Sequence, residues 1–209
     1  MYDVIVVGAR CAGSPLAMLL ARQGHRVLVV DRASLPSDTP STHYLQQYGI
    51  ARLRNWGLLD EVMATGVAPM TEMTVSFGDD VITGFAGPID GITATIAPRR
   101  TVLDAILAGA AERAGAEIRL GFTVTDLLFD GDAVVGVRGT DAGGREVTER
   151  ATVVVGADGR TSSVARMVGA TTYDEVPAAC FIYYGYVDGP DLQFHSRIGV
   201  REQFGAWPT

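Results

Sequence analysis

The stretch that decides the fold is MYDVIVVGARCAGSPLAMLLARQGHRVLVVDR, residues 1–32. Residues 3–8 form an apolar, β-branched run that ends at glycine, which is typical of a strand buried on both faces of a parallel sheet. Residues 12–23 carry leucines at helical spacing and precede a glycine placed to end a helix. Residues 26–30 repeat the buried-strand pattern and are closed by Asp31. A strand, a glycine-rich turn, a helix and a second strand in this order predict a βαβ unit.

The turn of this unit reads GARCAG, where a dinucleotide-binding loop reads Gly-x-Gly-x-x-Gly. Gly8 keeps the role of forming the turn, and Gly13 keeps that of close helix–strand packing. Arg10 replaces the glycine that lets the backbone approach a pyrophosphate, but its guanidinium suits phosphate oxygens. A helix that begins near Ala12 also offers unpaired N–H groups to a phosphate. We therefore interpret GARCAG as a working variant of a phosphate-binding loop rather than as a turn that binds nothing.

A carboxylate follows at the distance that a dinucleotide site requires. Asp31 lies 23 positions after Gly8, at the end of the second expected strand. It is placed to accept hydrogen bonds from a ribose hydroxyl, and its charge repels a 2′-phosphate. The segment therefore predicts dinucleotide binding. Cys11 lies inside the loop, where a helix start can lower the pKa of a thiol, but we favour a small packing residue there.

Composition excludes several classes of protein. The chain has 209 residues, 47% of them hydrophobic and 20% charged, as in an ordinary globular protein. A formal net charge of −7 without a basic cluster argues against nucleic acid and against an anionic membrane surface. No apolar run reaches the roughly 18 residues of a membrane span, and residues 4–7 lack the basic leader of a secretory signal. Cys11 and Cys180 have no metal-ligand spacing, so we expect no metal site and a reduced, cytoplasmic setting.

Beyond the first unit the pattern alternates between loop, helix and strand. The expected elements are a loop at 33–43, a helical pattern at 45–59, a β-hairpin within 71–96 around Gly78-Asp79-Asp80, a helix at 99–114, an antiparallel meander from 117 to 155, and a strand at 180–187. The apolar run before Gly156 predicts a strand, and the residues after it, Gly156-Ala157-Asp158-Gly159, are expected to form a loop followed by a helical turn. Strands and helices thus alternate over most of the chain, which predicts the α/β class.

Three motifs resemble the flavin-dependent monooxygenases related to p-hydroxybenzoate hydroxylase, whose architecture isoprenoid-lipid reductases and flavin-dependent halogenases share. The motifs are VVGARCAGSPLAMLLARQGHRVLVVDR (6–32), PRRTVLDAILAGAAERAG (98–115) and GADGRTSSVAR (156–166). They stand in family order and carry the resemblance over residues 1–166, whereas residues 167–209 match only in their β-character. The resemblance implies a Rossmann-like FAD-binding fold with an inserted β-meander and part of a β-rich substrate domain. The expected FAD-binding domain comprises residues 1–70 and 98–170, and the partial substrate domain comprises residues 71–97 and 171–209.

The resemblance also implies which residues hold the cofactor. They are Gly8, Arg10, Ala12 and Gly13 at the pyrophosphate, Asp31 and Arg32 at the adenosine ribose, Arg100 at the central region, Val124 at the adenine through its backbone, Asp158 near the pyrophosphate, and His43 at the flavin ring. Three of these have structural alternatives. Arg100 can be a surface charge near a helix start, Asp158 can shape a turn, and His43 lies in what composition indicates is an exposed loop. No residue is an evident acid, base or nucleophile, so the sequence identifies no catalytic residue.

The implied activity is that of an FAD-dependent monooxygenase that uses NAD(P)H to oxygenate a small organic substrate. The absence of a second glycine-rich βαβ unit for a nicotinamide nucleotide fits this group and disfavours two-domain disulfide reductases. Alternatives are a flavin-dependent reductase of isoprenoid lipids and a non-catalytic nucleotide-binding fragment. Five aromatic residues are compatible with an apolar or aromatic ligand, although a place in the core is the interpretation that we favour: Phe77, Phe85, Phe181, Tyr183 and Tyr184.

The chain departs from the family pattern in two places. Arg10 replaces a glycine, and the sequence ends at Thr209 before the Gly-Asp segment that contacts the ribitol in family members. We therefore expect a fragment or a truncated gene product with an incomplete substrate sheet and exposed apolar edges. The sequence does not indicate the identity of the substrate or the oligomeric state.

Overall fold

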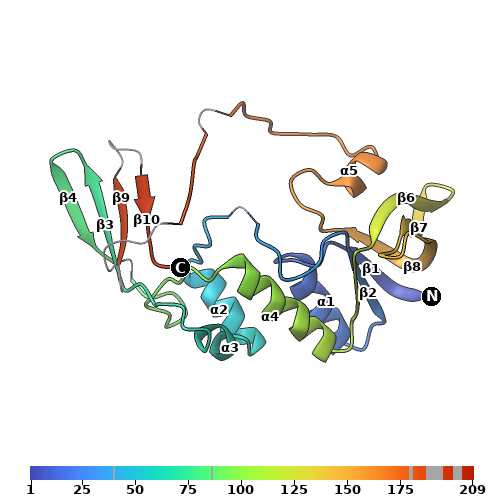
Figure 1. The fold of residues 1–209 in the computed structure, drawn as a ribbon, viewed down its shortest axis with the longest axis horizontal. Coiled ribbons are helices and arrows are strands. Elements are labelled where there is room, and N and C mark those ends of the chain that lie inside the picture. Colours follow the sequence, from blue (N-terminus) through green and yellow to red (C-terminus); the bar gives the residue numbers. More distant parts are fainter. Residues whose placement is uncertain (40, 86, 179–180, 187–194, 200–203) are drawn as a thin grey trace.

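The computed structural model describes residues 1–39, 41–85, 87–178, 181–186, 195–199 and 204–209, and contains two sheets with helices between them (Figure 1). The elements are β1 (Tyr2–Val7), α1 (Gly13–Arg22), β2 (Val27–Asp31), α2 (Gln47–Trp56), α3 (Leu59–Met63), β3 (Glu72–Phe77), β4 (Asp80–Gly84), α4 (Arg100–Arg113), β5 (Glu117–Leu120), β6 (Thr123–Asp130), β7 (Ala133–Thr140), β8 (Glu146–Gly156), α5 (Ser163–Met167), β9 (His195–Gly199) and β10 (Phe204–Ala206).

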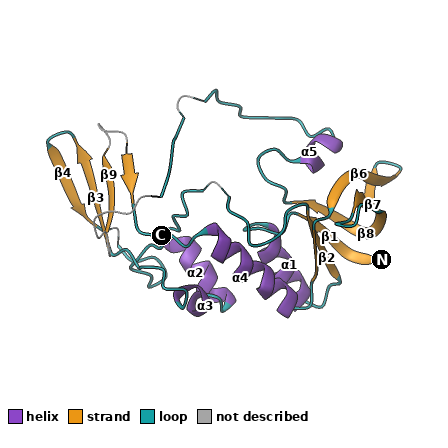
Figure 2. Cartoon of the chain, viewed as in Figure 1, coloured by secondary structure: helices purple, strands orange, loops and turns teal. Residues whose placement is uncertain are grey.

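The larger sheet has the strand order β5-β2-β1-β8-β7-β6. Its first four strands, β5, β2, β1 and β8, are parallel. The pairs β8–β7 and β7–β6 are antiparallel. The strand β8 belongs to both arrangements, because residues 146–150 pair with β7 and residues 151–156 pair with β1. Figure 2 shows this sheet at the opposite end of the molecule from the smaller one. The expected α/β class, with a βαβ unit and an inserted meander, is confirmed.

Strands at the centre of this sheet are buried on both faces, as the apolar runs predict. Val6 points into a cluster that includes residues of α1, α2 and α4. Ile5 and Val7, one position away on either side, point into a second cluster that includes residues of the meander and Val164 of α5. Successive side chains of a strand lie on opposite faces, so β1 supports both cores at once.

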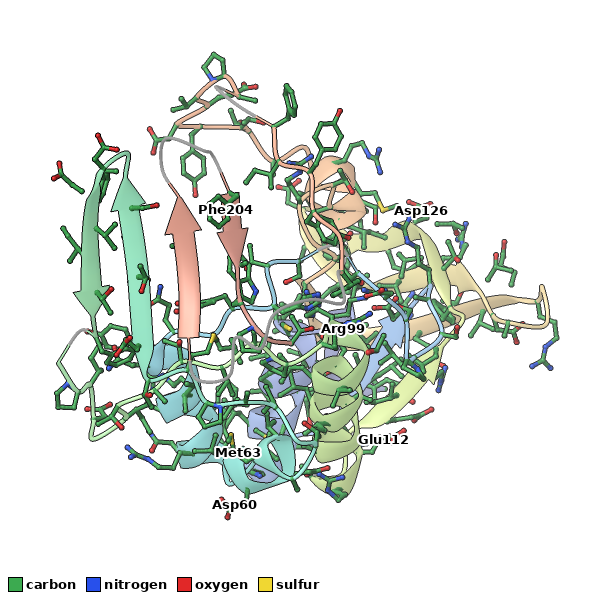
Figure 3. All side chains as sticks on the ribbon, turned by 60° about the vertical axis from the view of Figure 1, so that its left-hand side comes forward. Asp60, Met63, Arg99, Glu112, Asp126 and Phe204 are labelled. Carbon is green, nitrogen blue, oxygen red and sulfur yellow. The ribbon has the colours of Figure 1, made fainter. Side chains whose placement is uncertain are left out.

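The smaller sheet has the order β10-β9-β3-β4. The expected hairpin is present, with Phe77 paired to Asp80 across a two-residue turn. Its strand β3 pairs in parallel with β9, more than a hundred residues later. This sheet is poorly covered by the described residues: Ile82 of β4 and Phe204 of β10 are 64% and 49% exposed, and Figure 3 labels Phe204.

Two elements differ from the expected pattern. Residues 117–120 are the parallel edge strand β5 and not the first strand of the meander, because Gly121 adopts a φ of +69° and turns the chain before β6. The helical pattern at 45–59 forms two helices, since Gly57 ends α2 in the left-handed conformation. Its first residue, Leu45, instead pairs with Ile96 in an isolated bridge.

The strand expected at 180–187 is also wrong for the residues that the structure describes. Residues 181–186 have no strand partner, and residues 180 and 187 lie outside the described part. A β-favouring composition forms a strand only where another strand accepts its backbone hydrogen bonds. The expectation that the five aromatic residues are core is wrong as well, since four are more than half exposed: Phe77, Phe181, Tyr183 and Tyr184.

Candidate functional site

A cleft of about 730 Å³ lies at the carboxyl ends of the parallel strands. Gly8 follows β1, Asp31 ends β2, and Ala157 follows β8, and all three line it. In open α/β sheets, ligands bind beyond this edge of the sheet. Eight of the ten predicted site residues line the cleft: Gly8, Arg10, Ala12, Asp31, Arg32, Arg100, Val124 and Asp158.

The loop between β1 and α1 is compact because it has glycine at both ends. Gly8 has a φ of +113°, and a Cβ there would lie 2.3 Å from the carbonyl oxygen of Ala157. A Cβ on Gly13 would lie 1.8 Å from the carbonyl oxygen of Gly8. Larger residues would therefore displace backbone at both positions. Gly13 does not line the cleft itself but lets α1 start directly against the end of β1.

The start of α1 is available to an anion. Ala12, which precedes the helix, makes no side-chain cap, and the first turn contains no acidic residue. The first amides of a helix have no partner within the helix and carry the positive end of its dipole. Ala12 lines the cleft, so the positive end of the α1 dipole lies at its wall, although the Ser14 N–H already donates to the Arg10 carbonyl oxygen.

Asp31 joins the loop to the second strand. Its Oδ2 accepts a hydrogen bond from the Ala9 N–H, and its Oδ1 accepts one from the Ala33 N–H, both at 2.8 Å. Each carboxylate oxygen can accept a further bond. Asp31 therefore holds the loop in place and still has acceptor capacity facing a ligand in the cleft.

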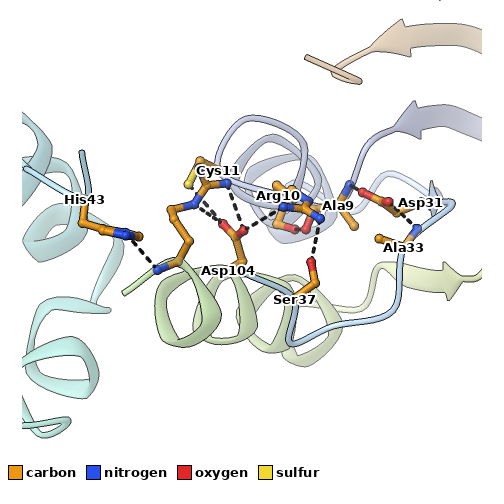
Figure 4. Close-up of polar contacts among 10 residues, drawn as sticks. Ala9, Arg10, Cys11, Asp31, Ala33, Ser37, His43 and Asp104 are labelled. Atoms are coloured by element: carbon orange, nitrogen blue, oxygen red, sulfur yellow. Dashed lines mark hydrogen bonds and ion pairs between the residues drawn. The ribbon is translucent and has the colours of Figure 1, made fainter. Parts of the chain in front are cut away.

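Asp104 of α4 organises the polar side chains between the loop and α4 (Figure 4). Its carboxylate is fully buried and accepts two hydrogen bonds from Arg100, from Nε at 3.0 Å and from Nη2 at 2.9 Å. Arg10 Nη1 lies 3.9 Å from Asp104 Oδ2, and its Nη2 donates to Ser37 Oγ at 2.6 Å. Two cationic side chains of the cleft therefore share one buried carboxylate.

Cys11 also contacts this carboxylate, because its Sγ donates a hydrogen bond to Asp104 Oδ1 at 3.2 Å. Although other parts of the residue are exposed, desolvation of the sulfur and the adjacent negative charge raise the pKa of the Cys11 thiol to about 12. The alternative of a thiol with a lowered pKa is therefore wrong. A high pKa disfavours the reactive thiolate, so Cys11 is poorly suited to act as a nucleophile.

His43 is buried, which corrects the exposed loop that composition indicated. It adopts a φ of +58°, and its Nδ1 accepts the backbone N–H of Arg100 at 3.2 Å. Desolvation and the nearby Arg99 lower the pKa of the imidazole. In the neutral ring the remaining proton is then on Nε2, which lies 2.5 Å from the Tyr186 hydroxyl. His43 therefore fixes the start of α4 without lining the cleft.

Asp158 also lines the cleft, and it shapes the turn before α5. Its Oδ1 accepts the Ser162 hydroxyl, and its Oδ2 accepts the Ser163 hydroxyl and two backbone N–H groups, those of Ser163 and Val164. Desolvation opposes ionisation here, but these hydrogen bonds outweigh it and lower the pKa of the carboxyl.

Sequence reasoning missed the central role of Asp104. The signal was present: Asp104 follows Arg100 by one helical turn and stands beside Leu103 on an otherwise apolar face. An acidic residue at a buried helical position needs a cationic partner, and the residue four positions earlier supplies it.

The sequence matches the family described as FAD binding domain over residues 1–181. The chain belongs to this FAD-binding family. A menaquinone reductase from Mycolicibacterium smegmatis is 32% identical over 188 residues, which cover 90% of this chain and 44% of the relative. Aklavinone 12-hydroxylase from Streptomyces peucetius is 30% identical over 197 residues, which cover 86% and 40% of the two chains.

Solved structures agree with this family. A probable FAD-dependent monooxygenase from Pseudomonas aeruginosa superposes with a TM-score of 0.70 at 28% identity, over 85% of this chain and 48% of its own. A flavin-dependent monooxygenase solved with FAD and substrate superposes with a TM-score of 0.67 at 28% identity, over 80% and 32%. The FAD-binding chain thus spans less than half the length of the curated relatives named above.

The cleft of this FAD-binding chain fits a dinucleotide. It combines an uncapped helix start, two glycine positions that tolerate no Cβ, a carboxylate at the end of β2, and four lining arginines: Arg10, Arg32, Arg100 and Arg166. Among the described residues, none of the helices has the length and apolar character needed to cross a membrane. The same described part gathers no group of three or more side chains suited to a metal ion.

Proposed function

We propose that the cleft binds FAD. The observation that carries the proposal is the convergence of the loop after β1, the end of β2, the start of α4 and the loop after β8 on one cavity. In this arrangement Gly8, Ala12 and the start of α1 hold the pyrophosphate, while Gly13 permits the tight turn. Asp31 accepts from the adenosine ribose.

The remaining predicted residues complete the proposed site. Arg10 and Arg100 contribute positive charge toward the phosphates and the centre of the cofactor, and Arg32 lies beside the ribose. Val124 on β6 offers its backbone to the adenine, and Asp158 lines the wall near the pyrophosphate. His43 acts from outside the cleft, by holding the backbone at Arg100 close to the flavin end.

We propose an FAD-dependent monooxygenase activity toward a small apolar or aromatic organic substrate, with NAD(P)H as the electron donor. When bound, FAD supplies the redox chemistry, and the protein supplies position and charge. The similarity to aklavinone 12-hydroxylase and to the monooxygenase structures supports this activity. We place the FAD-binding domain at residues 1–70 and 98–170 and the substrate domain at residues 71–97 and 171–209. The sequence contains only two cysteines, far apart and without metal-ligand spacing, which favours a cytoplasmic location.

A second candidate activity is reduction of an isoprenoid lipid. It is favoured by the similarity to the menaquinone reductase and to a digeranylgeranylglycerophospholipid reductase from Methanosarcina acetivorans, 29% identical over 178 residues. Both candidates use the same cofactor cleft but differ in the substrate and in the reaction, since an oxygenase transfers an oxygen atom from O2 and a reductase does not consume oxygen. A non-catalytic nucleotide-binding module is the outcome in which FAD binds and neither activity follows.

The first experiment is a titration of the purified chain with FAD, followed by visible absorption and by flavin fluorescence, with NAD as the control ligand. We expect the protein to quench the fluorescence of FAD saturably, and we expect an excess of NAD not to displace the bound FAD. A monodisperse, folded sample that binds neither nucleotide would contradict the proposal. If FAD binds, oxidation of NADH and of NADPH with oxygen uptake distinguishes an oxygenase from a reductase that consumes menaquinone without oxygen.

A further inference from the structure

Asp104 is the one fully buried carboxylate among the described residues, and it contacts Cys11 of the loop after β1. Burial of a charged carboxylate is costly unless cationic partners and hydrogen bonds compensate for the lost water. Here the compensation comes from residues of two elements: Arg100 of α4, and Arg10 and Cys11 of the loop after β1. The carboxylate thus connects the phosphate-binding loop to α4.

The geometry at Arg100 leaves donors for a ligand. A guanidinium has five N–H donors, and Asp104 accepts two of them, from the Nε and Nη2 edge. Three donors remain on a side chain that lines the cleft. Two parallel bonds to one carboxylate also fix the plane of the guanidinium, so those donors have a defined direction.

Arg10 is held by the same group from the other side. Its Nη1 lies near Asp104 Oδ2, while its Nη2 donates to Ser37. The negative charge of Asp104 therefore lies close to both positive side chains. Without it, two like charges would stand together at the cleft wall and repel each other.

We propose that Asp104 is a positioning residue that holds Arg10 and Arg100 in place for the pyrophosphate of the cofactor, and that it keeps the neighbouring Cys11 thiol protonated. This inference rests on the proposed function, since it assumes that FAD occupies the cleft. It assigns a role to a residue that does not itself line the cavity.

The contact with Cys11 gives a reporter that does not require the cofactor. Asp104 Oδ1 accepts the S–H of Cys11 and places a negative charge beside the sulfur. Loss of that charge lowers the pKa of the thiol and increases the thiolate fraction. A merely structural role of Asp104 in packing predicts no such change in a variant that remains folded.

The first arm of the test measures the rate of thiol alkylation against pH in a Cys180→Ser background, where Cys11 is the one remaining cysteine. In that background we expect the rate of Cys11 alkylation to rise with pH and to reach half its maximum well above pH 9. With Asp104→Asn added, we expect the rate at pH 8 to rise at least about tenfold, the factor for one unit of pKa. Asp38→Asn is the matched control, because it removes a carboxylate from an exposed ion pair with Arg99.

The second arm measures the Kd for FAD by fluorescence quenching. We expect Asp104→Asn to weaken binding at least about tenfold and Asp38→Asn to change it by less than about twofold, about 1.4 and 0.4 kcal/mol respectively. Arg100→Lys should weaken binding as Asp104→Asn does, because an ammonium cannot contact a carboxylate and a phosphate in a fixed plane. Circular dichroism establishes that each variant is folded.

The outcomes separate the two proposals. Failure of the parent chain to bind FAD refutes the proposed function. Normal FAD binding by the parent chain together with an unchanged Kd in Asp104→Asn refutes the positioning role alone. If Asp104→Asn does not fold, two other measurements test the inference. A Cys11 thiol in the Cys180→Ser background that titrates near pH 8.5 would overturn it. FAD affinity that is unchanged in Arg100→Lys would overturn it as well.

Discussion

Arg10 Nη2 donates a hydrogen bond to Ser37 Oγ over 2.6 Å, although the two residues lie on loops that follow different strands. The side chain that replaces the middle glycine of the motif therefore bridges the loop after β1 and the loop after β2. It lines the cleft while doing so. This explains how an arginine fits in a turn where a smaller residue is usual: the side chain runs along the cleft wall.

Arg10 is expected to contribute to FAD affinity. Arg10→Ala removes a positive charge from the cleft, so we expect the Kd for FAD to rise about tenfold, or about 1.4 kcal/mol. Ser37→Ala is the matched control, since it removes only the hydrogen-bond partner and should have a smaller effect. The measurement is fluorescence quenching at low salt, where charge contributes most. An Arg10→Gly variant that binds FAD as tightly as the parent chain would contradict this role.

Gly13 is expected to tolerate no side chain. A Cβ there would overlap the carbonyl oxygen of Gly8, so the backbone of the loop must move. We expect Gly13→Ala to cost about 3 kcal/mol or more and to lower the Tm by roughly 6–12 °C. Gly109→Ala in α4 is the control: its new Cβ meets only the end of the Arg113 side chain, and the helix should gain about 0.5–1 kcal/mol. Equal Tm values for the two variants would count against the tight turn.

Asp31 is expected to be required for affinity more than for folding. Asp31→Asn replaces one acceptor oxygen by a donor, which disturbs the bonds from Ala9 and Ala33 and the proposed bond to the ribose. We expect FAD binding to weaken by about 1.5–3 kcal/mol, the range for hydrogen bonds to a charged group. Asp130→Asn, at the exposed end of β6, serves as the control. An unchanged Kd in Asp31→Asn would remove this residue from the site.

The stability conferred by Asp158 is expected to depend on pH. Its pKa is lower in the folded chain than in the unfolded chain, where it is about 3.9. Its contribution is therefore complete above that value and is lost as the pH falls through the lower, folded pKa. We expect Asp158→Asn to reduce the free energy of unfolding by about 1–2 kcal/mol at pH 7, and by less at pH 3.

Urea unfolding at the two pH values measures the effect of Asp158→Asn. Asp79→Asn, in the exposed turn between β3 and β4, is the control and should show no such dependence. A difference between Asp158→Asn and the parent chain that is the same at pH 3 and at pH 7 would indicate a role for Asp158 in packing alone.

The sequence predicted the elements whose signals are local. The βαβ unit follows from a strand, a turn and a helix that adjoin one another. Six of the eight predicted site residues that line the cleft stand at or just after the ends of parallel strands, which meet at one edge of the sheet. The misassigned β5 shows the limit of such signals. Its residues are equally suited to a meander, and only the pairing with β2 makes it parallel.

The parts that sequence reasoning missed depend on contacts between distant segments. Asp104 is buried because Arg10 and Cys11 reach it from a loop more than ninety residues away. His43 is enclosed in part by Tyr186, whose hydroxyl contacts its ring. Local composition contains no record of Tyr186, so it indicated a solvent-exposed loop at His43. The spacing of Asp104 from Arg100 signals an ion pair on α4 but not the contacts of Asp104 with Arg10 and Cys11.

The position of β1 between β2 and β8 has a consequence for synthesis on the ribosome. Tyr2 pairs with Ala151 and Val4 with Val153, so the edge of β1 that faces β8 stays unpaired until about 150 further residues have been translated. At typical elongation rates this interval lasts roughly 8–30 s. During that time the emerging βαβ unit presents an unpaired strand edge in which four of the six residues are valine or isoleucine. The nascent chain is therefore most exposed to misassociation before β8 appears, and chaperone occupancy should fall once residue 156 has left the exit tunnel.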